Sequence, residues 1–136
     1  MRLFIKIVLF LLLPFLVAGQ DTTITISPGM MKSNVFSLGK IDGWLFKKGN
    51  DTSWTGKDIN VSEWQKLKPS ELSEKLTDKN GRLEGWFRIK IKLDPAFRDT
   101  ILDIYMNVWA ASDVYMDGKL FYTFGNTGAN GKPFTE

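Results

Sequence analysis

The sequence predicts an all-β protein, an antiparallel β-sandwich with one short helix. The clearest evidence is residues 86–93 (WFRIKIKL), where apolar and polar residues alternate strictly, as they do in a half-buried strand. A second observation is Asp117-Gly118 between two strand-like segments, because this dipeptide is favoured in tight hairpin turns. Turn-forming residues also recur about every ten residues, which is typical of the short strands of a sandwich.

The predicted elements before residue 61 are short. Residues 21–27 (DTTITIS) alternate Thr and Ile as a strand does. Residues 35–38 are predicted to form a second strand and residues 44–46 (WLF) a third, which the turn formers Gly49-Asn50-Asp51 close. Residues 51–60 are predicted to be a surface loop.

The single predicted helix lies near residues 69–76. Pro69 suits a first helical position, and Leu72 and Leu76 share one face at four-residue spacing. The following Asp78-Lys79-Asn80-Gly81 resembles part of a calcium loop but lacks the other oxygen donors, so it is predicted to be a turn.

The remaining predicted strands follow the segment 86–93. Residues 101–109 alternate again, and two such strands in succession favour an antiparallel sheet. Residues 112–116 and 119–124 flank Asp117-Gly118 and are predicted to complete a hairpin.

Residues 1–19 are predicted to be an export signal, which places the rest of the chain outside the cytoplasmic membrane. They combine the positive charges of Arg2 and Lys6 with an apolar run and small residues before Gln20. The run of about twelve residues is shorter than the roughly twenty that span a bilayer, which favours a cleaved signal. A retained membrane anchor is the less favoured alternative. Residues 20–42 are then lead-in strands, and residues 43–136 are the sandwich.

Composition excludes several functional classes. Removal of the signal leaves 16 of the 18 basic residues against 15 acidic ones, so the mature chain is nearly neutral and no nucleic-acid partner is expected. The chain has no cysteine, hence no disulfide, and no histidine. The second absence removes Ser-His-Asp and Cys-His catalysis and the usual zinc sites. No metal or cofactor is expected.

Several sequence islands together resemble the galactose-binding-like jelly roll. They are residues 43–46 (GWLF) with 49–51 (GND) and Trp54, then 58–64, 85–88 (GWFR) and 112–118 (SDVYMDG), which match that superfamily in order and rough spacing across 43–125. A jelly roll normally uses eight strands, whereas six or seven are predicted, so we expect the sandwich to be incomplete at the C-terminus.

Two families share these islands. Residues 111–128 are more similar to the periplasmic N-terminal domain of bacterial membrane sensors, which include histidine kinases and seven-transmembrane receptors with diverse intracellular signalling modules. The other family is the sugar-binding N-terminal domain of family 2 glycoside hydrolases, where we expect an Asn-Gly hairpin and a Gly-Gly stretch. This chain has Asp117-Gly118 and no Gly-Gly.

The resemblance implies an extracytoplasmic sensory domain that is not itself an enzyme. Its ligand would be an unknown small molecule or carbohydrate, and its signal would pass to membrane-embedded and cytoplasmic modules of the same parent chain. A carbohydrate-binding domain of a secreted glycoside hydrolase is the alternative, and a plain secreted binding protein is the third interpretation. Apolar spans of about twenty residues beyond residue 136 would favour the sensor, and an α/β barrel the hydrolase.

Most residues of the islands have structural roles in this interpretation. Trp44, Trp64 and Trp86 are predicted to pack in the core and between sheets, because each ring can bury about 150–250 Å². Arg88 is predicted to pair with a carboxylate such as Asp103 or to lie on the second face of the sheet.

Two other tryptophans are the better candidates for ligand contact. Trp54 lies in a polar loop, and Trp109 lies at a strand end beside two alanines. An aromatic face packs on the C–H surface of a sugar while polar neighbours bind its hydroxyls. Asp117 and Gly118 are predicted to form the hairpin turn only.

Overall fold

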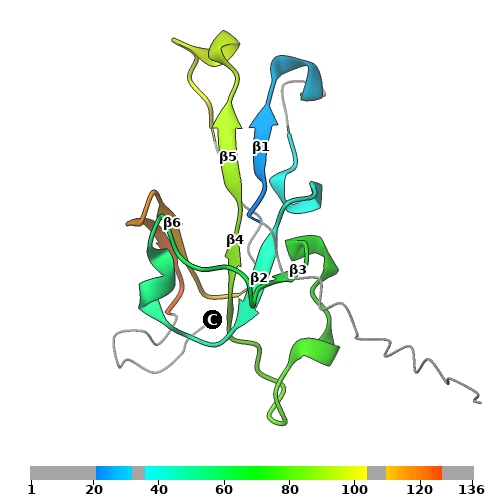
Figure 1. The fold of residues 1–136 in the computed structure, drawn as a ribbon. Helices are drawn as coiled ribbons and strands as arrows, with labels where there is room; N and C mark the ends of the chain where they lie inside the picture. Colours follow the sequence, from blue (N-terminus) through cyan, green and yellow to red (C-terminus); the bar gives the residue numbers. More distant parts are fainter. Residues whose placement is uncertain (1–20, 32–35, 104–109, 127–136) are drawn as a thin grey trace, which may run out of the picture.

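The computed structural model describes residues 21–31, 36–103 and 110–126 (Figure 1). This part of the chain consists of short strands and 3-10 turns and contains no long helix, which confirms the all-β prediction at that level. The strands are β1 (Thr23–Ile26), β2 (Leu45–Lys48), β3 (Gln65–Lys66), β4 (Gly85–Arg88), β5 (Lys90–Leu93), β6 (Ser112–Met116) and β7 (Lys119–Phe124). The 3-10 turns are η1 (Pro28–Met30), η2 (Leu38–Lys40), η3 (Thr52–Thr55), η4 (Pro69–Glu71), η5 (Glu74–Leu76) and η6 (Pro95–Phe97).

The described strands form three small sheets. The central sheet is antiparallel in the order β3-β2-β4, so Phe46 on β2 lies opposite Gln65 on one side and Phe87 on the other. The strands β1 and β5 form a second sheet, and β6 and β7 form a third. The connection between the first two sheets is direct, because β4 runs on into β5 with a break only at Ile89.

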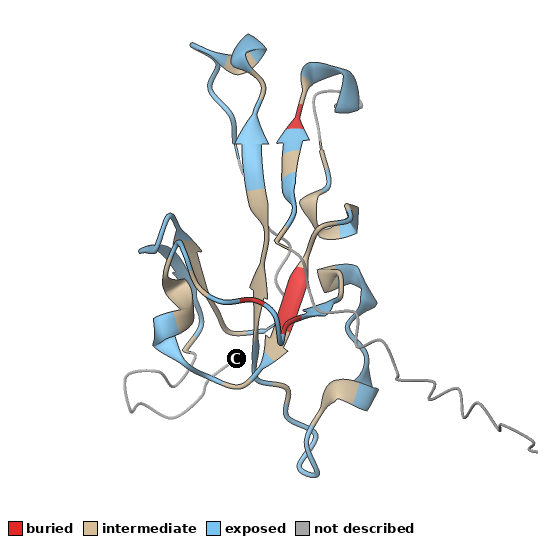
Figure 2. Cartoon of the chain, viewed as in Figure 1, coloured by how far each residue is buried: buried red, intermediate tan, exposed pale blue. Residues whose placement is uncertain are grey.

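The pairing of β1 with β5 is parallel, with Ile24 opposite Ile91, so the antiparallel prediction is wrong for this pair. Side chains alternate with period two in both kinds of sheet, and the alternation therefore says nothing about strand direction. The predicted inner face of residues 86–93 is also only partly covered, since Ile91 and Leu93 are 39% and 49% exposed. Figure 2 shows most of β5 in the colour of exposed residues, beside β1.

The best-buried part of the described chain lies on β2, where consecutive side chains are buried on opposite faces of the sheet. Leu45 is 1% exposed and packs with Val61 and Trp64, while Phe46 is 2% exposed and lies 4.8 Å from the Phe87 ring, centroid to centroid (Figure 2). Two successive buried residues identify a strand covered from both sides. The described core is thus centred on β2.

Two predicted elements are wrong. The segment predicted as one helix near residues 69–76 forms η4 and η5, because Leu72 (ψ 135) and Ser73 (φ −144, ψ 160) between them are extended. Leu72 remains 43% exposed, so no apolar surface stabilises a continuous helix here. The strand predicted at residues 35–38 is absent from its described part, where residues 36 and 37 are irregular and η2 begins at Leu38.

The hairpin prediction is confirmed. Asp117 and Gly118 have φ values of +49° and +78°, as a two-residue hairpin turn requires, and β6 and β7 pair on either side. Tyr115 packs on Trp86 at 5.4 Å between ring centroids, which attaches the hairpin to β4.

Two other predictions fall wholly or mainly outside the described residues. The export signal at residues 1–19 is one of them. Of the strand predicted at 101–109, only residues 101–103 are described, and they have no regular structure. A helix with the length and apolarity needed to cross a membrane is not found in residues 21–31, 36–103 or 110–126.

Candidate functional site

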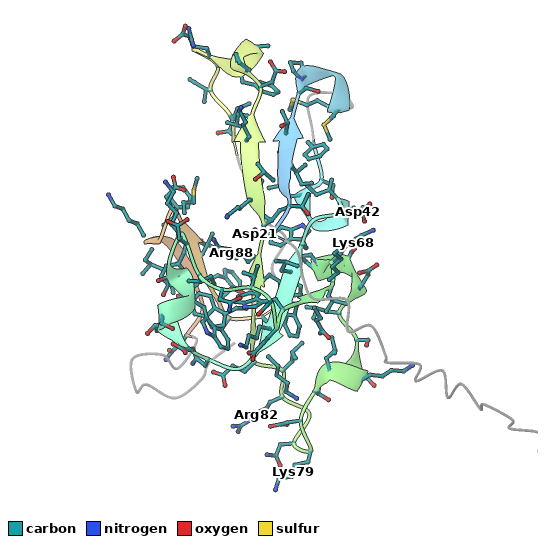
Figure 3. The ribbon with its side chains drawn as sticks, viewed as in Figure 1. Asp21, Asp42, Lys68, Lys79, Arg82 and Arg88 are labelled. Atoms are coloured by element: carbon teal, nitrogen blue, oxygen red, sulfur yellow. The ribbon has the colours of Figure 1, made fainter. Side chains whose placement is uncertain are left out.

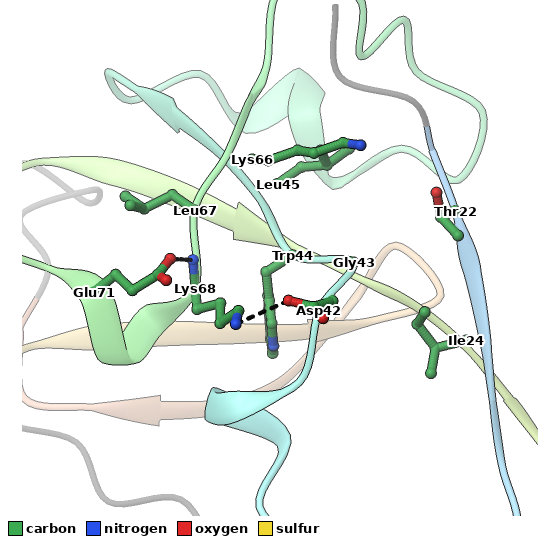
Figure 4. Close-up of a pocket in the computed structure, with 10 residues that line it drawn as sticks. All are labelled: Thr22, Ile24, Asp42, Gly43, Trp44, Leu45, Lys66, Leu67, Lys68 and Glu71. Atoms are coloured by element: carbon green, nitrogen blue, oxygen red, sulfur yellow. Dashed lines mark hydrogen bonds and ion pairs between the residues drawn. The ribbon is translucent and has the colours of Figure 1, made fainter. Parts of the chain in front are cut away.

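A cleft of about 490 Å³ separates β1 from the neighbouring edge of the central sheet (Figure 4). One side of the cleft is Thr22 and Ile24 at β1. The opposite side comes from the chain that enters β2 and from the segment that follows β3. Its lining residues are Thr22, Ile24, Asp42, Gly43, Trp44, Leu45, Lys66, Leu67, Lys68 and Glu71.

Gly43 sets how closely the two sides of the cleft approach. Its φ of +99° favours glycine, and a Cβ there would lie 2.9 Å from Cγ1 of Ile24. The next residue, Trp44, is held in place by its indole Nε1, which donates to the carbonyl of Leu38 at 2.6 Å. Its ring also meets Phe87 edge to face at 6.1 Å between centroids. The indole is therefore a fixed part of the cleft wall.

An ion pair lies beside this indole, on the side of the cleft that faces β1. Lys68 Nζ lies 2.8 Å from Asp42 Oδ1, and the two side chains are 30% and 90% exposed (Figure 4). The hydrogen bond from Lys68 and its charge lower the pKa of Asp42, and the same contacts raise the pKa of Lys68. Glu71 fixes the backbone here, because its Oε2 accepts from the Lys68 N–H at 2.9 Å. The pair is accessible to a ligand.

The charges of the lining balance. Lys66 and Lys68 supply two ammonium groups, and Asp42 and Glu71 supply two carboxylates. Ammonium groups only donate hydrogen bonds and ionised carboxylates only accept them. Together with the indole of Trp44 and the methyl groups of Ile24, the cleft suits an uncharged polar ligand that has an apolar face.

Trp54, the first predicted ligand contact, lies elsewhere. It is part of η3, and its ring meets Trp64 and Trp86 edge to face at 5.6 and 6.4 Å between centroids. Lys47 Nζ lies 5.0 Å above the ring, and Trp54 also packs on the cluster of Leu45 and Val61. These contacts make Trp54 a wall of the core. It does not line the cleft. Trp109, the second predicted contact, is outside the described residues.

The predicted structural residues occupy varied positions. Trp64 is 2% exposed in the core beside Leu45, and its Nε1 has no hydrogen-bond partner there. Trp86 packs between Trp54 and Tyr115. Trp44 lines the cleft, and Asp117 and Gly118 form the hairpin turn.

Arg88 does not pair with Asp103, as one prediction had it. Its guanidinium donates to two backbone carbonyls, those of Gly56 at 2.8 Å and of Lys57. It therefore ties the loop that contains η3 to β4 (Figure 3). The partners of Arg88 are thus backbone carbonyls of the loop at residues 51–60. The sequence pattern suggested a carboxylate and gave no sign of these carbonyls.

The charged residues of the cleft were not predicted from the sequence. Asp42 and Lys68 are 26 positions apart and belong to no recognisable motif. Only Gly43 before a tryptophan strand gives a local sign of close packing. Strand pairing brings the two residues together, because Leu67 N donates to the Trp44 carbonyl at 3.3 Å. The neighbouring residues Lys68 and Asp42 are then close enough to form their ion pair.

Comparison with known proteins gives no family. No protein-family model matches the chain, and neither the curated proteins nor the solved structures contain a match to it. The cleft and the sequence resemblance are therefore the basis of the functional proposal.

Proposed function

We propose that this chain is the extracytoplasmic ligand-binding domain of a membrane signal-transduction protein, such as a sensor histidine kinase. The observation that carries the proposal is the cleft between β1 and the central sheet, with its fixed indole and both signs of charge. The domain binds a small polar molecule, with a carbohydrate as the first class to test, and performs no chemistry on it. A galactose-binding-like jelly roll is the fold that the resemblance implies.

Hydrogen bonding explains why a carbohydrate suits this lining. Each sugar hydroxyl both donates and accepts, so it can bridge the carboxylate of Asp42 and the ammonium of Lys68, which lie 2.8 Å apart. The C–H face of the ring can pack against Trp44. Because Trp44 is already held by Leu38 and Phe87, the side chain loses little freedom when the ligand binds.

The first test is a binding screen on the 136-residue chain. Neutral mono- and disaccharides, followed by other small polar molecules, are titrated while tryptophan fluorescence is recorded, and each hit is measured by calorimetry. Asp42→Asn should weaken binding of a hit about tenfold or more, because a hydrogen bond to a charged group contributes roughly 1.5–3 kcal/mol.

The matched control is Glu63→Gln. Glu63 forms an ion pair of the same length, 2.8 Å, with Lys47, but it does not line the cleft. This variant should bind as the wild type does. An equal loss of affinity in Asp42→Asn and Glu63→Gln would show that the ligand does not bind in the cleft. The absence of any hit would contradict the proposed function.

The parent protein can be tested separately. If the parent is a sensor, the same gene should encode segments of about twenty apolar residues. The ligand found in the screen should then change the kinase activity of the intact parent in membranes. An α/β-barrel glycosidase encoded with this domain would instead assign it to a secreted hydrolase.

A further inference from the structure

The charges of the cleft lining balance in number but not in position. Lys68 has two carboxylates beside it: Asp42 Oδ1 lies 2.8 Å from its ammonium, and Glu71 Oε2 accepts from its backbone N–H at 2.9 Å. Lys66 has no such neighbour. Among the described residues, no ion pair or hydrogen bond involves its side chain. The lining therefore has an acidic end at Asp42 and a basic end at Lys66.

Strand pairing fixes the separation of these two ends. Lys66 is the last residue of β3, and the Leu67 N–H that follows donates to the Trp44 carbonyl, so the chain stays extended up to Lys68. Alternate residues of an extended chain share a face and lie about 6–7 Å apart. This separation suits a ligand of the size of one sugar ring.

The close-up of the cleft shows the same arrangement. The ammonium of Lys66 is turned toward the Thr22 end of β1 (Figure 4). The Asp42–Lys68 pair lies nearer Ile24, and a Cβ on the adjacent Gly43 would be 2.9 Å from Cγ1 of Ile24. A ligand that fills the cleft between β1 and the central sheet thus meets both ends.

The group without a partner is an ammonium, and this decides the charge of the ligand. The carboxylates of Asp42 and Glu71 already accept hydrogen bonds from Lys68, so they have less need of a cationic ligand group. Lys66 has three donors and no acceptor of its own among the described residues. The cleft therefore offers an unmet positive charge at one end.

We propose that the cleft prefers a sugar acid, a sugar that carries one carboxylate, to the corresponding neutral sugar. The carboxylate accepts a charge-assisted hydrogen bond from Lys66, while the ring hydroxyls bind the Asp42–Lys68 pair as those of a neutral sugar do. This inference rests on the proposed function, because it names the ligand class of the same cleft.

A carboxylate suits the single free ammonium better than a phosphate does. A phosphate ester carries a charge of about −1.5 to −2 at pH 7, so part of that charge would be left without a partner and would face the carboxylates at the acidic end. Lys66 is exposed, and an exposed ion pair contributes at most about fivefold to affinity. We therefore expect a sugar acid to bind about fivefold more tightly than its neutral counterpart.

The test is calorimetry of the full chain with two matched pairs of sugars, galacturonate with galactose and glucuronate with glucose. Within each pair the ligands differ only in the carboxylate. At low salt the acid should bind about fivefold more tightly, and about 0.5 M NaCl should remove most of this difference through screening. A preference that came from shape alone would not respond to salt.

Three variants assign the preference to one side chain. Lys66→Gln should lower the affinity for the acid to that for the neutral sugar and leave the neutral sugar unaffected. Lys66→Arg, which retains the charge, should keep the preference. Lys92→Gln is the matched control, since Lys92 is also an exposed strand lysine but lies on β5 and does not line the cleft. It should behave as the wild type.

Three results would overturn the inference. They are equal affinity of the wild type for acid and neutral sugar, a Lys66→Gln variant that keeps the preference, and galactose 6-phosphate that binds more tightly than galacturonate. In each case the proposed function stands, provided that Asp42→Asn weakens binding of the sugars. If no sugar of either pair binds, nor any other small polar molecule, the proposed function fails and this inference fails with it.

Discussion

Gly85 shows how much one missing side chain decides at the residue scale. A Cβ on this residue would lie 2.4 Å from Cε2 of Phe46, and Phe46 is 2% exposed, so the ring has no free space to move into. Gly85 lies opposite Lys48 on β2, where its hydrogen atom leaves room for the ring. The conformation of Phe46 depends on this position.

Gly85→Ala should lower the free energy of unfolding by about 1–3 kcal/mol through overpacking. The measurement is urea denaturation followed by tryptophan fluorescence. Gly29→Ala is the control, since a Cβ there meets nothing within 4 Å, and it should leave stability unchanged or slightly raise it. Equal stability of the two variants would show that Phe46 can repack.

The burial of Trp54 is a feature of a single residue that its sequence neighbours did not predict. Its polar neighbours predicted an exposed residue available to a ligand, whereas the ring packs against Trp64 and Trp86. Loop composition reports the solvent exposure of the average residue and says nothing of which single side chain turns inward. The cleft-lining indole is Trp44, which the sequence marked as structural.

At the scale of elements, the loop of residues 52–57 depends on the strand it touches. The guanidinium of Arg88 on β4 donates to the carbonyls of Gly56 and Lys57, and Thr55 O lies close to the hairpin turn, 3.3 Å from where a Cβ of Gly118 would be. Arg88 thus fixes the loop between β4 and the hairpin.

Arg88→Lys should loosen this loop. A lysine ammonium lacks the planar fork that reaches two carbonyls at once, so one acceptor loses its partner, at a cost of about 1–3 kcal/mol. Hydrogen exchange measured by mass spectrometry should speed up for residues 52–57 while β1 is unaffected. Arg82→Lys in the distant turn is the control (Figure 3). Unchanged exchange in the loop would rule out the fixing role of Arg88.

Elements differed in how far the sequence predicted them. The strand β1, the turn Asp117-Gly118 and the strands beside it follow from local chemistry, because alternation and positive φ are properties of neighbouring residues. The helix predicted where η4 and η5 lie had the local spacing of a helix, but no neighbouring surface buries Leu72, so a continuous helix is not stabilised. The parallel pairing of β1 with β5 joins segments more than sixty residues apart, where no local pattern applies.

At the scale of the whole molecule, acid should be a general destabiliser. Among the described residues, four carboxylates have pKa values below their usual range, each because of a nearby donor. The hydrogen bond to the partner is the largest cause in every case: Lys68 for Asp42, Ser53 for Asp51, Lys47 for Glu63 and Arg82 for Asp78.

The sign follows from linkage. A pKa that is lower in the folded than in the unfolded state adds stability above the unfolded value, about 4 for these groups, and the stability is lost as the pH falls through the folded value. The urea midpoint should thus be level near neutral pH and drop below about pH 4. Asp42→Asn should make the drop smaller, and a midpoint that does not change between pH 7 and pH 2.5 would contradict the prediction.

The sequence by itself determined the all-β class, the hairpin, the strand segments of β1, β2, β4 and β5, and the exclusion of cysteine and histidine chemistry, because composition and period-two alternation are properties of the local sequence. Only the tertiary structure decided the parallel β1–β5 pair, the packing of Trp54 into the core and the cleft whose lining includes the Asp42–Lys68 ion pair. The physical reason is distance along the chain. Strand pairing brings remote residues together, and the contacts that result depend on which edges meet.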